Sequence, residues 1–119
     1  MRPERSYSDY LEDILEAIEE IFSFVEAMGL DAFLSDRRTN LAVIRALEII
    51  IEAVRHIPEG VRNNHPQVLW QEMMAMRNML IHQYFGVDLE GLCRTVEEDL
   101  PALRDDNRRM LAEMEEEDR

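Results

Sequence analysis

Apolar residues recur at spacings of three and four along most of the chain. The first stretch is the clearest case, and its stripe consists of Leu11, Ile14, Leu15, Ile18, Ile21, Phe22, Val25 and Met28. Such spacing puts apolar side chains on one face of an α-helix, because the helix turns once every 3.6 residues. No stretch alternates polar and apolar residues as a half-buried strand would. The pattern predicts an all-α fold.

Four stretches carry this periodicity and a cap or breaker at one end. They predict an antiparallel bundle of four main helices with short connections, spanning about 8–28, 37–56, 68–85 and 88–104. At 119 residues the chain is expected to form a single domain, 1–119. Its core would cover about 7–104, followed by a charged tail, 105–119, whose last part, 113–119, is expected to fray.

Caps and breakers set the expected helix ends. Gly29 is well placed to end the first helix, and Ser35 or Asp36 can cap the second. Residues 59–66 are expected to form a loop after Pro58. Proline is tolerated in a first helical turn, so Pro101 is expected to restart or kink the last helix.

The second helix is apolar over an unusually wide arc. This width predicts burial on two sides, against the domain core and against something else. One apolar row and the residues that widen it are Leu41, Ile44, Leu47, Ile51 and Val54, with Val43, Ile50 and Ile57.

Composition narrows the classes of function. The net charge of −13 argues against broad nucleic-acid affinity, which rests on many phosphate contacts. The single cysteine, Cys93, excludes an intrachain disulfide framework and a cysteine-based zinc site, and it fits a reducing cytoplasm. No apolar run is long enough to span a membrane, and the N-terminus lacks a signal-peptide segment. We therefore expect a cytoplasmic protein without a membrane partner.

The third helix contains the one tight grouping of polar residues in an apolar setting: Arg77, Asn78, His82 and Tyr84. On a helical wheel the apolar neighbours fall within about 80° on either side of Arg77. This predicts that Arg77 lies in the middle of the apolar face, where a guanidinium needs a carboxylate, water or an anion. Glu48 and Glu52 of the second helix are candidate partners.

His82 lies about 140° around the helix from Arg77, so one straight helix does not bring both to one surface. Either the last turn loosens or a second copy of the chain completes the site. A single arginine on an apolar helix is also commonly a buried ion pair, and a single histidine a core residue. His56 and His65 are expected to have structural or solvent roles. The chain has neither a metal-ligand spacing nor a glycine-rich phosphate loop, so no metal and no cofactor are expected.

The spacing Arg77-x4-His82-x-Tyr84 resembles the Arg-x4-His-x-Tyr motif of HEPN-domain ribonuclease toxins, specifically the HepT-like family. The resemblance extends over about residues 7–104. Ile51, where family members often have glycine, and Gln83 depart from the pattern. The other segments that resemble the family, in order, are 10–18, 36–39, 42–45, 47–50, His65-Pro66, Trp70, Met76-Arg77-Asn78, 84–88 and 99–101.

The resemblance implies a helical bundle that forms a homodimer, or a higher oligomer, with motif helices meeting at the interface. It implies metal-independent endoribonuclease activity. His82 would move the proton of a ribose 2′-OH or of the leaving 5′-oxygen, since imidazole has an ordinary pKa of about 6.5. Arg77 would stabilise the charge on the phosphorane, and Asn78 would orient the imidazole. The products would end in 2′,3′-cyclic phosphates.

The resemblance also implies a biological setting, that of the toxin in a type VII toxin–antitoxin system. Its partner would be a nucleotidyltransferase antitoxin that transfers AMP to Tyr84 and so blocks the RNA site. Because the chain is acidic, RNA contacts would depend on local arginines, with Arg37, Arg38 and Arg45 as candidates. The alternative is a non-catalytic HEPN module that binds nucleotides or pairs with a nucleotidyltransferase.

Overall fold

The computed structural model describes residues 6–68, 70–83 and 89–117. Within these ranges the chain is helical, without a strand, and its elements confirm the all-α bundle of four main helices. The long helices are α1 (Tyr7–Val25), α3 (Arg37–Arg55), α5 (Trp70–Gln83) and α7 (Leu100–Glu117). The shorter elements are α2 (Leu30–Ser35), α4 (Glu59–Asn64), α6 (Leu89–Arg94) and a π-helical turn (Thr95–Asp99).

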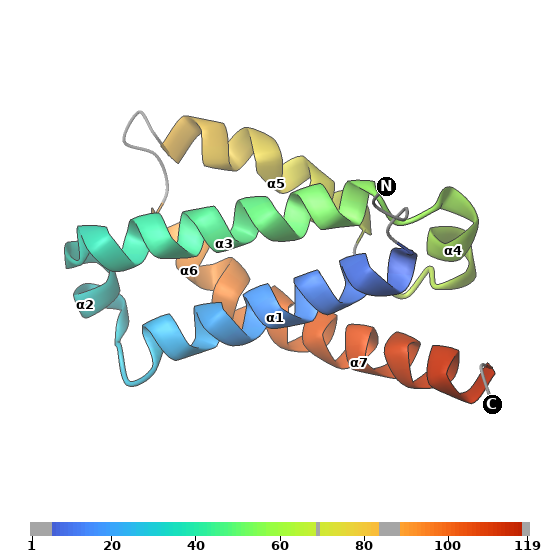
Figure 1. The fold of residues 1–119 in the computed structure, drawn as a ribbon. Helices are drawn as coiled ribbons and strands as arrows, with labels where there is room; N and C mark the ends of the chain where they lie inside the picture. The colour runs from blue at the N-terminus through green and yellow to red at the C-terminus, as the bar shows by residue number, and fades with distance from the viewer. Residues whose placement is uncertain (1–5, 69, 84–88, 118–119) are drawn as a thin grey trace, which may run out of the picture.

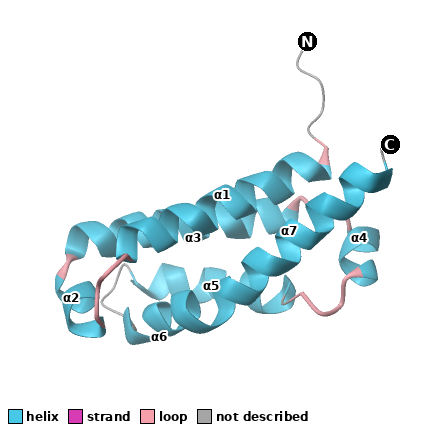
Figure 2. Ribbon diagram, turned by 90° about the horizontal axis from the view of Figure 1, so that it is seen from below, coloured by secondary structure: helices cyan, strands magenta, loops and turns pink. Residues whose placement is uncertain are grey.

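The four long helices pack in a chain of neighbours. α1 and α3 lie antiparallel over most of their length, α7 crosses α1, and α5 packs on the other side of α3 (Figure 1). Figure 2, viewed from below, shows α1 and α3 overlapping along one side of the bundle, with α7 crossing them and α5 below them. α3 therefore lies between α1 and α5.

The core forms where the predicted stripes meet. In α1 and α3 the innermost side chains are completely buried: Leu11, Ile14, Ile18 and Ile21 of α1, and Val43, Leu47, Ile50 and Val54 of α3. Leu100 and Leu103 of α7 are also buried and complete the core on the side of α7. Burying a large apolar side chain stabilises a fold by about 1.5–3 kcal/mol, so this contact supplies much of the driving force.

The wide apolar arc of α3 is covered mainly within the chain itself. Its two buried sides face α1 and α5. The expectation that something beyond the domain core must cover α3 is therefore wrong for most of the arc. Leu41, which we predicted in the buried row, is 45% exposed, and Ile49 is 37% exposed.

The start of α3 is fixed by the predicted cap. The Asp36 carboxylate accepts a hydrogen bond from the Thr39 backbone N–H at 3.1 Å. This bond satisfies one of the free donors of the first turn. It also holds the pKa of Asp36 below its ordinary value.

Two predicted boundaries at the ends of the bundle are wrong. α1 ends at Val25 rather than near Gly29, because Ala27 takes the left-handed conformation (φ 62°) that usually ends a helix at glycine. Gly29 instead precedes α2 as its N-cap. Residues 59–64, part of the expected loop 59–66, instead form α4. Pro58 is its N-cap, and the Pro58 carbonyl accepts a hydrogen bond from the Arg62 N–H at 3.0 Å.

The predicted restart at Pro101 is confirmed, and it follows a π-helical turn. Proline has no N–H and cannot bond the carbonyl four residues back. The Leu100 N–H bonds to the Thr95 carbonyl five residues back, and Pro101 then stands in the first turn of α7. The wider turn thus ends the preceding α-helix, and α7 begins directly after it with Pro101 in its first turn.

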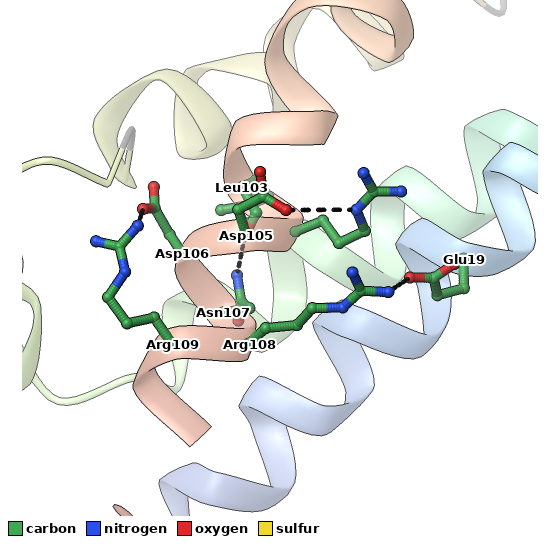
Figure 3. A network of polar contacts seen from close by, with 8 residues as sticks. Glu19, Leu103, Asp105, Asp106, Asn107, Arg108 and Arg109 are labelled. Carbon is green, nitrogen blue, oxygen red and sulfur yellow. Dashed lines mark hydrogen bonds and ion pairs between the residues drawn. The ribbon is translucent and has the colours of Figure 1, made fainter. Parts of the chain in front are cut away.

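We expected 113–119 to fray, but the described part of this stretch, 113–117, is helical, since α7 continues to Glu117. Asn107 and Met110 are buried against the bundle. Figure 3 shows Arg108 reaching across to Glu19 of α1, with Nη2 and Oε1 2.7 Å apart. The many charged residues of this stretch led us to predict a frayed tail, because they mask the apolar residues that pack α7 against the bundle.

Candidate functional site

The motif helix α5 is positioned by an apolar face turned to α3. Its buried residues are Trp70, Met73, Met76 and Leu80. The Trp70 indole N–H donates to the His65 carbonyl at 3.0 Å and so fixes the beginning of the helix. The centre of these four described positions lies roughly 45° around the helix from Arg77, the centre that we predicted.

This rotation changes the environment of Arg77. We predicted Arg77 in the middle of the apolar face, and that prediction is wrong, because the residue is exposed. Met76 takes the interior position, and Met74 on the other flank is 37% exposed. The exposed Arg77 guanidinium is therefore solvated by water rather than buried.

Arg77 lines a groove of about 340 Å³ between α3 and α5. Ile51 and Leu80, both nearly buried, are its apolar lining. The remaining lining residues are charged: Arg45, Glu48, Glu52 and Arg55 from α3, with Arg77 from α5. The groove therefore brings three guanidinium groups and two carboxylates together.

The two α3 arginines that line the groove, Arg45 and Arg55, are paired within their own helix. Arg45 Nη1 lies 3.3 Å from Glu48 Oε2, and Arg55 Nη1 lies 3.4 Å from Glu52 Oε2. Among the residues that the structure describes, Arg77 has no ion-pair partner within 4.0 Å. The predicted pairing of Arg77 with Glu48 or Glu52 is therefore not formed, although all three residues line the groove.

The other motif residues are described only in part. Asn78 and His82 belong to α5, but their side chains lie outside the description, as does the whole of Tyr84. Because α5 is helical through Gln83, positions 77 and 82 are roughly 140° apart around its axis. One copy of α5 does not place these two positions on the same face.

The predicted RNA contacts are not all in one place. Arg45 lines the groove, whereas Arg37 and Arg38 lie exposed in the first turn of α3 and are not part of its lining. Sequence reasoning missed Arg55. The sequence could have indicated Arg55, because Glu52 and Arg55 have the same three-residue spacing on α3 as Arg45 and Glu48.

A second hollow, of about 210 Å³, lies between α1 and α3. The His56 ring stacks on the Tyr10 ring, with centroids 4.6 Å apart and planes 9° apart. His56 Nε2 also lies 3.2 Å from Glu52 Oε1. His56 thus braces α1 against α3 and holds the carboxylate that Arg55 shares.

Other reactive groups add little to the site. Burial, and then the nearby Glu97 carboxylate, raise the pKa of the Cys93 thiol. In the described ranges no three His, Cys, Asp or Glu side chains gather to hold a metal ion. None of the helices in those ranges has the length and apolarity needed to cross a membrane.

Comparison with known proteins gives one consistent result. The family model described as "Ribonuclease HepT-like" matches residues 14–110. The chain belongs to the HepT-like ribonuclease family. This confirms the predicted family and places the chain in a family of ribonucleases, in agreement with the predicted endoribonuclease class. Residues 14–110 include α3, α5 and all of the groove between them.

Individual HepT-like relatives agree with the family model. The chain is 53% identical over 100 residues to "Probable ribonuclease HepT" of Thermococcus cleftensis, covering 84% of this chain and 91% of the relative. It is 35% identical over 114 residues to "Putative RNase MJ0125" of Methanocaldococcus jannaschii, covering 96% of this chain and 98% of the relative. No solved structure matches the chain.

Proposed function

We propose that the protein is the toxin of a type VII toxin–antitoxin pair and cleaves RNA at a cleft shared by two copies. The observation that carries this proposal is Arg77, which is exposed on the wall of the groove without an ion-pair partner among the described residues. An exposed guanidinium without an ion-pair partner can bind a phosphate, whereas a buried guanidinium paired with a carboxylate would serve only to stabilise the fold.

The chemistry needs only side chains. His82 removes the proton of a ribose 2′-OH as that oxygen attacks the phosphorus, or protonates the 5′-oxygen as its bond to phosphorus breaks. Arg77 stabilises the negative charge that develops on the phosphorane oxygens. Asn78, one turn before His82, orients the imidazole. The products are a 2′,3′-cyclic phosphate and a 5′-hydroxyl.

A second copy of the chain would complete this arrangement. Positions 77 and 82 lie on different faces of one helix, so Arg77 of one copy and His82 of the other would meet where two α5 helices face each other. The two copies also supply one histidine for each of the two proton transfers. The assembly is a homodimer or a higher oligomer built on it.

The mechanism predicts cleavage in the absence of divalent metal. Purified protein in excess EDTA should cleave single-stranded RNA at the rate seen with Mg²⁺, because no step uses a metal ion. The new ends should resist direct ligation and become substrates for a 2′,3′-cyclic phosphodiesterase. Loss of cleavage in EDTA, with recovery on adding Mg²⁺, would contradict the mechanism.

Regulation follows from Tyr84, two positions beyond His82 in the motif. We propose that a nucleotidyltransferase antitoxin transfers AMP to its hydroxyl, placing negative charge and bulk beside the RNA site. Coexpression with a nucleotidyltransferase encoded beside this gene should add the mass of one or more AMP groups to the intact protein. Tyr84→Phe should keep its unmodified mass. Modification of both proteins at another residue would contradict the assignment.

The two carboxylates of the groove favour a second candidate, a non-catalytic module that binds nucleotides or a nucleotidyltransferase partner. Glu48 and Glu52 stand beside the arginines and weaken the attraction for a polyanion. This candidate predicts that the protein leaves RNA intact under all conditions. RNA length and end chemistry after incubation therefore separate the two.

A further inference from the structure

The groove between α3 and α5 carries more positive charge than the motif requires. Arg77 faces it from α5, and Arg45 and Arg55 line it from α3. The two α3 residues are ten positions apart, which corresponds to roughly 15 Å along a helix. Successive phosphates of a stacked strand advance about 3.4 Å, so the arginines span about four nucleotides.

The ion pairs that occupy the two α3 arginines are weak. The side chains are 73% and 33% exposed in the Arg45–Glu48 pair, and 49% and 62% exposed in the Arg55–Glu52 pair. Exposed pairs of this kind contribute little to stability and exchange readily with other partners. A phosphate, like a carboxylate, can accept two parallel hydrogen bonds from a guanidinium, so it can compete for arginines held in such exposed pairs.

Glu52 is held at the groove by a second contact. Its Oε1 lies 3.2 Å from His56 Nε2, and the His56 ring is stacked on Tyr10 of α1. When Arg55 turns to another anion, this contact keeps the carboxylate close by. The carboxylate therefore remains a competitor for Arg55.

We propose that Arg45 and Arg55 form, with Arg77, a track for the phosphate backbone of single-stranded RNA, and that Glu48 and Glu52 lower its affinity by competing for the two α3 arginines. The inference rests on the proposed RNA cleavage and adds the path of the substrate beyond the reacting phosphate. It also accounts for RNA binding by a chain of net charge −13, since the attraction is local. Ile51 and Leu80 give the groove an apolar lining that a base face can contact.

Direct binding tests the track separately from catalysis. The probe is a fluorescein-labelled octanucleotide with 2′-O-methyl ribose, which has no 2′-OH to attack the phosphorus. Fluorescence anisotropy over a range of salt concentrations gives both the affinity and its salt dependence. Arg55→Gln and Arg45→Gln should each bind about tenfold more weakly, and each should lower the slope of log affinity against log salt by about 0.7.

The carboxylates should act in the opposite direction. Glu52→Gln and Glu48→Gln keep the shape of the side chain, remove the competing charge and should tighten binding several-fold. Arg109 and Asp106 provide matched controls, because they form an i,i+3 pair at 3.3 Å on α7, away from the groove. Arg109→Gln and Asp106→Asn should bind the octamer as the wild type does.

Several results would overturn the proposal. One is a wild-type salt slope in Arg55→Gln and Arg45→Gln, and another is no gain of affinity in Glu52→Gln and Glu48→Gln. Failure of the wild type to bind the octamer would overturn it as well. Unmodified RNA separates this failure from that of the proposed function: if it is still cleaved in an Arg77-dependent way, the chemistry stands and only the track is wrong.

Discussion

His82→Ala is expected to lower the rate of RNA cleavage about 10²–10⁴-fold, the loss typical of removing a general acid–base group. Arg77→Ala should lose about 10²–10³-fold, because charge on the phosphorane is no longer compensated. Expression of the wild type should arrest growth, whereas neither variant should. Cleavage of a labelled RNA by each purified protein measures the effect.

Stability separates a catalytic Arg77 from a structural one. Arg77 is exposed and has no ion-pair partner among the described residues, so the melting temperature of Arg77→Ala should match that of the wild type. Arg94→Ala is a suitable control, since Arg94 is exposed on α6 and does not line the groove. It should remain toxic and active. Equal toxicity of the wild type and both motif variants would rule out this mechanism.

Leu47→Ala is expected to destabilise the protein by about 2–5 kcal/mol, the range for a buried leucine whose removal leaves a cavity. Leu47 is completely buried at the centre of α3, where α1 covers the helix. Leu41→Ala is the matched control, because Leu41 lies on the same helix and is 45% exposed. Urea unfolding followed by circular dichroism gives both free energies of unfolding.

The comparison of the two leucines tests the packing of α3. Leu41→Ala should change the free energy of unfolding by less than about 0.5 kcal/mol. A loss at Leu41 as large as that at Leu47 would mean that an oligomer interface covers the exposed residue in solution. The dependence of unfolding on protein concentration would then identify that interface.

Most of the fold could be predicted because its determinants are local. The apolar stripes of α1 and α3, the Asp36 cap and the Pro101 restart all depend on residues within one or two turns. The end of α1 was missed because Ala27 adopts a conformation that sequence assigns to glycine. α4 was missed because Pro58, which follows the end of α3, also serves as the N-cap of a new helix. The last turns of α7 were missed because charged residues obscure the apolar contacts of Met110 and Met114 with the core.

The family could be predicted from the residues of the candidate site, but the geometry of the site could not. The Arg77, His82 and Tyr84 spacing leads to the family, which the comparisons confirm. An ideal helical wheel could not tell whether Met76 or Arg77 faces the interior, because this depends on how α5 packs against the surface of α3. Arg55 was missed for a related reason: its relevance appears only when α5 lies beside α3.

The position of α5 at the edge of the bundle has a consequence for motion. α5 packs chiefly on α3, whereas α1 is clamped between α3 and α7. Local opening of a protein follows its weakest contacts, and such openings occur far more often than global unfolding. We therefore expect the helix that carries the motif to open locally more often than the remaining three long helices. Amide hydrogen exchange would register this as a separate, faster unit at the side of the protein where the chemistry is proposed.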